Sequence, residues 1–254
     1  LDVYAEASHI FIKAQEALQF PDAEIGREVF IYCMKLLGAG FDQEPGIRAQ
    51  GAECFADAVL QQTLNNIFLH VVVGAEFRGD DGRDFAALEA FIDVIDLACE
   101  GTVATKVSMG AMCMASFAKM MVQADDYPPT LLRNVCRCMI KLIVSCKQNK
   151  DRLGAWGFLG ESFTNSTDVY FQIQVAELIF RIGREKKAFF SNLDLPVATI
   201  KYLKALPNNP KLMDLIVELV EDFNDTREPR LVIAFPIQQF IAGGPTSPLS
   251  TSPS

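Results

Sequence analysis

The segment from Asp168 to Arg184, which reads Asp-Val-Tyr-Phe-Gln-Ile-Gln-Val-Ala-Glu-Leu-Ile-Phe-Arg-Ile-Gly-Arg, would be apolar on nearly every face of a helix. A surface helix usually carries its apolar residues on one stripe, so this segment needs helices packed against more than one of its sides. Further segments with a helical pattern follow at 195–206 and 211–224. Together these segments predict a stack of helices.

Apolar residues recur at intervals of three and four along most of the chain, which is the pattern of amphipathic helices. Short polar turns rich in Gly, Pro, Asn and Asp separate the helical segments, and no strand pattern interrupts them before Leu231. The predicted helices cover residues 3–19, 24–38, 46–73, 85–100, 103–123, 129–148, 151–163, 168–184, 195–206 and 211–224.

This order of elements predicts an all-α fold of stacked helical hairpins. Successive helix pairs are spaced at about 40 residues, the range of armadillo and HEAT repeats, although no repeat motif aligns along the chain. We therefore expect an armadillo/HEAT-like right-handed helical solenoid, with a globular helical bundle as the alternative. Asp168 and Asn209 are predicted N-caps, and Pro210 would then occupy the first helical position.

The helical pattern of apolar residues ends at Arg230, where the continuous apolar run Leu-Val-Ile-Ala-Phe is followed by Pro236. This run predicts a short C-terminal strand leading toward a second domain. The last residues are rich in Gly, Pro and Ser and contain too little apolar surface to fold. The predicted organisation is a helical domain over 1–228, a strand segment or the start of another domain over 229–242, and a flexible tail or linker over 243–254.

Composition narrows the classes of partner. Half of the 254 residues are hydrophobic, which is enough for a sizeable core, and the formal net charge is -9. A negative protein repels phosphate backbones, so we expect protein partners and no direct binding to nucleic acid. The seven cysteines are odd in number and lack paired spacing, which suits a reducing compartment. We expect neither a membrane span nor a secretory signal.

No motif in the chain predicts catalysis. The only two histidines of the chain, His9 and His70, lie far apart in sequence. Cys136 and Cys138 would point about 200° apart on a helix, which is a poor geometry for chelating zinc. The glycines between Gly154 and Ser162 lack the preceding strand and the lysine of a phosphate loop, and we expect them to allow close packing or a turn. We therefore predict no enzyme, no catalytic residue, no metal site, no cofactor and no small-molecule substrate. We expect Trp156 to anchor the core, with an exposed binding aromatic as the alternative.

Two stripes of like charge are the candidate partner-binding sites. Arg133, Arg137 and Lys141 recur every four residues on the predicted helix 129–148, so they would form one basic ridge on its exposed side. An acidic stripe on the last predicted helix consists of Glu218, Glu221, Asp222 and Asp225. The alternative interpretation of each stripe is a solvent-exposed helix face without a binding role.

The C-terminal third also resembles a known family. An ordered set of four segments begins at Asp168: Asp168-Val-Tyr-Phe-Gln-Ile-Gln-Val, Ala176-Glu-Leu-Ile-Phe-Arg, Glu185-Lys-Lys187 and Ala234-Phe-Pro-Ile-Gln-Gln-Phe-Ile. This set resembles the N-terminal region of the synaptonemal complex protein 2 family, best over residues 150–241. The resemblance implies an armadillo-like array followed by a pleckstrin-homology-like domain, and it implies no catalytic residue. The tail after Ile241 departs from the family's pattern, which leaves that second domain in doubt.

The resemblance implies a noncatalytic scaffold of the meiotic chromosome axis, located in the nucleus on meiotic chromosomes. Its partners would be other chromosome-axis or centromere proteins, docked through ridges such as Arg133, Arg137 and Lys141. The alternative from the helical pattern alone is a cytosolic armadillo-like adaptor that binds peptides or helices of other partners. An enzyme would require a cleft that joins His70 to a carboxylate.

Overall fold

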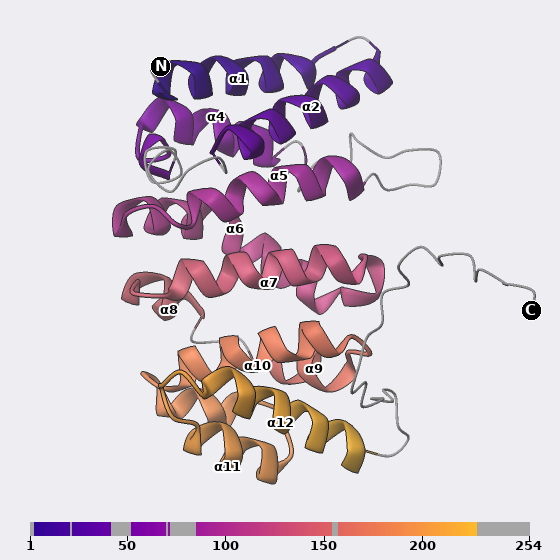
Figure 1. Ribbon diagram of the computed structural model, residues 1–254, viewed down its shortest axis with the longest axis vertical. Coiled ribbons are helices and arrows are strands. Elements are labelled where there is room, and N and C mark those ends of the chain that lie inside the picture. Colours follow the sequence, from indigo (N-terminus) through magenta and orange to yellow (C-terminus); the bar gives the residue numbers. More distant parts are fainter. Residues whose placement is uncertain are drawn as a thin grey trace, which may run out of the picture.

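The computed structural model describes residues 3–20, 22–41, 52–69, 71, 85–153 and 157–227. These residues form helices and their connections, with no strand among them (Figure 1). The helices are α1 (Val3–Ala17), α2 (Ala23–Phe41), α4 (Ala58–Phe68), α5 (Phe85–Ala98), α6 (Val103–Val122), α7 (Pro129–Ile143), α8 (Lys147–Leu153), α9 (Phe158–Asn165), α10 (Val169–Gly183), α11 (Val197–Ala205) and α12 (Leu212–Thr226), with short 3-10 helices η2 (Ala124–Asp126) and η3 (Lys187–Asn192).

The helices are stacked along the long axis of the molecule, from α1 at one end to α11 and α12 at the other (Figure 1). One row is formed by α2, α5, α7, α10 and α12, in which each helix contacts the next. A second row contains α4 and α6, and α6 then contacts both α8 and α9. The prediction of an all-α stack is confirmed for the described residues, and the arrangement is consistent with a helical solenoid.

A single hydrophobic core runs between the rows, from Ala7 in α1 to Phe223 in α12. In its N-terminal half, phenylalanine rings from different helices pack together. The centre of the buried Phe68 ring lies 6.2 Å from that of Phe91 and 6.3 Å from that of Phe117. These contacts connect α4 to α5 and to α6. Long-range ring packing of this kind adds to the stabilisation that apolar burial provides.

Helix α10 occupies the environment that its sequence predicts. It contacts α7, α9, α11 and α12, and Tyr170 is its one exposed residue. The predicted N-cap is also confirmed, since the Asp168 carboxylate accepts a hydrogen bond of 2.7 Å from the Phe171 N–H. A second predicted N-cap is wrong: α12 begins at Leu212, and the Asn209 side chain instead accepts from the Lys211 N–H in the preceding turn.

The predicted helix 129–148 is wrong in its last turn, because α7 ends at Ile143 and Ser145 adopts a positive φ of 59°. Side chains from elsewhere satisfy the carbonyls at this end. The buried Asn149 amide donates to Leu142 O at 3.0 Å and to Lys106 O at 2.7 Å, and Lys106 Nζ donates to Val144 O at 3.1 Å. The first turn of α6 and the last turn of α7 are thereby joined, and the chain turns into α8.

Two other predicted helices differ from the structure by more than a few terminal residues. The predicted helix 151–163 divides into α8 and α9. Within the described part of the predicted helix 46–73, α4 begins only at Ala58, after Asp57, whose carboxylate accepts from the Val59 and Leu60 N–H groups. Within the described ranges, no helix has the length and apolar character needed to cross a membrane. The predicted strand segment 229–242 and tail 243–254 lie outside the described residues.

Candidate functional site

The basic ridge on α7 faces carboxylates of the neighbouring helix α5. Arg137 Nε lies 3.2 Å from Asp96 Oδ1, and Lys141 Nζ lies 2.7 Å from Asp96 Oδ2. Lys141 Nζ also contacts Glu100 Oε1 at 2.6 Å. The Asp96 side chain is only 10% exposed, so both cations bond to a largely buried anion. Burial opposes the charge on Lys141, but its bonds to the two carboxylates dominate and raise the pKa of its ammonium group.

Arg133, the first residue of the ridge, contacts α10 rather than α5. Its guanidinium forms a two-pronged ion pair with the Asp168 carboxylate, and one of these bonds, from Nε to Oδ1, measures 2.9 Å. The guanidinium carbon also lies 4.9 Å from the centre of the Tyr170 ring. Burial raises the pKa of Asp168, but the bonds from Arg133 and from the Phe171 N–H outweigh it and hold that pKa below its usual range. Asp168 thus caps α10 and joins it to α7.

The three ridge residues are therefore brought together on α7, with each cation bonded to a carboxylate of an adjacent helix. The sequence reasoning missed these acidic partners. The available signal was the spacing of Asp93, Asp96 and Glu100, which places two carboxylates on one side of α5 and a third just beyond its last residue, Ala98. Binding of an external partner by the ridge stays a prediction.

Part of the ridge lines an open groove of about 560 Å³ between α2, α5 and α7. Arg137 and Lys141 lie on one side of this groove, Asp93 and Asp96 on another, and Lys35 of α2 on the third. Both signs of charge are present in this groove. It therefore offers no single preference for a cationic or an anionic partner.

The acidic stripe lies on α12, at one end of the stack (Figure 1). All four predicted residues, Glu218, Glu221, Asp222 and Asp225, are exposed. The Tyr202 hydroxyl donates to Glu218 Oε2 at 3.4 Å, which joins α11 to the stripe. The stripe is an acidic surface whose role in partner binding stays a prediction.

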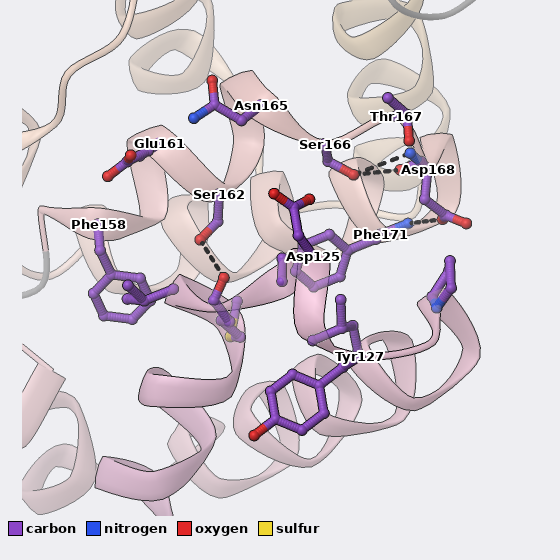
Figure 2. A pocket seen from close by; sticks show the side chains of 15 residues that line it. Asp125, Tyr127, Phe158, Glu161, Ser162, Asn165, Ser166, Thr167, Asp168 and Phe171 are labelled. Carbon is purple, nitrogen blue, oxygen red and sulfur yellow. Dashed lines mark hydrogen bonds between the residues drawn. The ribbon is translucent and has the colours of Figure 1, made fainter. Parts of the chain in front are cut away.

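A pocket of about 420 Å³ lies where α6, η2, α7, α9 and α10 meet (Figure 2). The sequence reasoning did not identify it, because its lining comes from segments between Met121 and Phe171 that only the fold brings together. Aromatic side chains line it at Tyr127, Phe158 and Phe171, and carboxylates line it at Asp125, Glu161 and Asp168. Its lining includes no Lys, Arg or His. The pocket therefore combines apolar walls with negative charge.

Figure 2 shows how the labelled side chains surround this pocket. The Asp125 carboxylate points toward the centre of the group, whereas Glu161 lies at its margin. The Ser162 hydroxyl is largely buried and donates to Met121 O at 3.4 Å. Asp168 belongs to the pocket wall and is bonded to Arg133 on its other side. The pocket thus adjoins one end of the basic ridge.

The histidines and cysteines considered for catalysis or metal binding form no metal-binding cluster among the described residues. His9 is exposed on α1, whereas His70 and Trp156 lie outside the described residues. Cys113, Cys136 and Cys138 are buried, and desolvation raises the pKa of each thiol well above its usual value. Among the described residues, no group of three His, Cys, Asp or Glu side chains could hold a metal ion. Gly160 confirms the predicted close packing, since an added Cβ would lie 2.9 Å from Asp194 N.

A family model matches most of the chain. The model of a family described as a repeat of unknown function (DUF8079) matches residues 2–222. No curated protein and no solved structure matches the chain. The matched residues include every helix of the stack up to most of α12.

Proposed function

The chain belongs to the family of this repeat, DUF8079, and on that premise we propose that it is a noncatalytic scaffold that docks other proteins. We further propose that the stack is an armadillo- or HEAT-like right-handed solenoid. The two rows of helices, with a pair added at each step along the axis, support this proposal. Such arrays present extended surfaces on which partners bind between successive helix pairs.

The pocket between α6, α7, α9 and α10 is the observation that carries the docking function. It is built from neighbouring elements of the stack, opens to solvent, and presents three aromatic rings beside carboxylates. Aromatic side chains in surface depressions are typical anchors of protein interfaces. The groove between α2, α5 and α7 provides a second depression on the same stack.

The class of partner is proposed from the sequence resemblance. The segments from Asp168 to Arg181 and from Ala234 to Ile241 support a role on the meiotic chromosome axis, with other axis or centromere proteins as partners. This proposal places the protein in the nucleus. A cytosolic adaptor for peptides or helices is the second candidate, and the pocket supports it equally, because a docking pocket does not depend on chromatin.

Affinity capture from nuclear and cytosolic extracts of meiotic cells tests these proposals. The bait is compared with two folded variants, Arg137→Gln in the ridge and Glu218→Gln/Asp222→Asn in the acidic stripe. Arg137→Gln is preferred to reversing all three ridge charges, because Lys141 still neutralises Asp96 in this variant. Circular dichroism and thermal unfolding establish that each bait is folded.

Capture of axis or centromere proteins, with the tagged protein located on meiotic chromosomes, would support the meiotic scaffold. Loss of these proteins in one variant would assign the docking surface to the ridge or to the stripe. Capture of defined cytosolic proteins alone, with a cytosolic location, would support the adaptor and overturn the meiotic role. Failure of folded protein to retain any specific partner from either extract would overturn the docking function.

A further inference from the structure

The pocket lined by Tyr127, Phe158 and Phe171 has the electrostatic character of a receptor for a cation. Three carboxylates and no cationic side chain are among its lining residues. A concave site lined by one sign of charge concentrates its field and attracts ligands of the opposite sign. Asp168 shares its charge with Arg133, so Asp125 and Glu161 supply most of this negative potential.

The wall of the same pocket shows which cation this chemistry suits. The Arg133 guanidinium is bound by the Asp168 carboxylate and stacks over the Tyr170 ring at 4.9 Å. A planar guanidinium forms paired hydrogen bonds with a carboxylate while its face contacts an aromatic ring. Asp125 and Phe171, which both line the pocket (Figure 2), offer a carboxylate and an aromatic ring on the pocket side.

Size and polarity also suit an arginine side chain. The volume of about 420 Å³ lies within the range of small-ligand pockets. Apolar residues such as Leu132 and Phe158 would cover the aliphatic stem, since arginine buries its methylene groups along apolar surface. Ser162 is only 7% exposed, and its hydroxyl donates to Met121 O, so its oxygen remains able to accept a guanidinium N–H.

We propose that this pocket binds an arginine side chain of a partner polypeptide, with Asp125 and Glu161 as its anionic contacts and Phe158 and Phe171 as its walls. This inference rests on the proposed docking function and names the chemistry that one docking site recognises. Lysine, a compact and strongly hydrated charge, would bind more weakly because it lacks the planar, paired donors.

Titration of the isotope-labelled full chain with N-acetyl-arginine methylamide tests the proposal by NMR. We expect saturable backbone shifts confined to segments around Asp125, Glu161 and Phe171. The neutral isostere N-acetyl-citrulline methylamide should bind about tenfold or more weakly, because it removes the charge-assisted bonds. In Asp125→Asn/Glu161→Gln, affinity for the arginine probe should fall by a similar factor of about ten.

Glu6→Gln/Asp214→Asn is the matched control, because it removes the same charge from exposed positions on α1 and α12 that belong neither to the pocket nor to the acidic stripe. This control should bind the arginine probe as the parent protein does. Equal loss in both variants would mean that net charge alone attracts the probe, and would overturn the pocket assignment. Shifts that map elsewhere, or no saturable shift from a folded protein, would overturn it as well.

Capture of partners by Asp125→Asn/Glu161→Gln separates failure of this inference from failure of the docking function. Retention of the same partners, without arginine binding in the pocket of the parent protein, would overturn the inference and preserve the scaffold. Arginine binding in the pocket by a protein that captures no partner would overturn the scaffold instead.

Discussion

Asp96 of α5 and Lys141 of α7 form an ion pair of 2.7 Å between residues 45 positions apart in sequence. Arg137 bonds to the same carboxylate, and Arg133 extends the series to Asp168 at the start of α10. The basic ridge thus connects three consecutive helices of one row. Its charges stabilise the stack even where they also line a surface groove.

Replacing Asp96 with alanine should destabilise the protein by roughly 2–3 kcal/mol, because Lys141 and Arg137 would lose a largely buried, charged hydrogen-bond acceptor. Urea unfolding followed by circular dichroism measures this change. Asp93→Ala is the matched control, since Asp93 is 59% exposed and lies 3.9 Å from Arg137. Its effect should stay within about 0.5 kcal/mol. Equal losses in the two variants would contradict the structural role of Asp96.

Stability should fall as the pH drops into the acid range, in part through Asp168. The folded-state pKa of this carboxyl is depressed, so its stabilisation is present above the unfolded pKa of about 3.9 and is lost as pH falls through the lower, folded pKa. Arg133→Gln removes a cause of the depression and should flatten the pH dependence below about pH 4. Urea midpoints at neutral and acid pH, compared between parent and variant, test this expectation. An unchanged slope would exclude the pair as a source of acid sensitivity.

The buried amides of Gln172 in α10 and Asn224 in α12 should be strongly coupled. Asn224 Nδ2 donates to Gln172 Oε1 at 2.8 Å, and Gln172 Nε2 donates to Phe163 O at 3.0 Å. Gln172→Leu or Asn224→Leu alone should cost about 1–3 kcal/mol, because each leaves a buried polar group unsatisfied.

The double variant should cost less than the sum of the two, by about 0.5 kcal/mol or more. Denaturant unfolding of all four proteins gives this coupling energy. Additive losses would mean that the two amides act independently.

Two helical glycines should respond in opposite ways to substitution by alanine. A Cβ at Gly110 in α6 would overlap the Asn149 amide, whose bonds to Leu142 O and Lys106 O join α6, α7 and α8. A Cβ at Gly38 in α2 would meet nothing within 4 Å.

Gly110→Ala should therefore destabilise by about 1–3 kcal/mol, whereas Gly38→Ala should stabilise by about 0.5–1 kcal/mol through helix propensity. Thermal and urea unfolding check both values. A neutral or stabilising effect at Gly110 would show that Asn149 can move away without cost.

Much of the helical order was predictable, since it depends on local periodicity and turn chemistry. The apolar run of α10 and the cap at Asp168 are both visible in neighbouring residues. Local sequence did not predict a helix boundary where side chains distant in sequence bond to the backbone at that boundary. The end of α7 at Ile143 depends on Asn149 and Lys106, and Lys106 lies 38 positions from the carbonyl that it bonds.

The candidate site divides in the same way. The sequence by itself determined that Arg133, Arg137 and Lys141 share one side of a helix, because that side repeats every three to four residues. Only the tertiary structure decided that Asp96 and Asp168 face these cations, and that Asp125, Glu161 and Phe171 surround one pocket. The physical reason is that helix formation follows from contacts within a few residues, whereas charge pairing and cavities depend on which helix surfaces pack together.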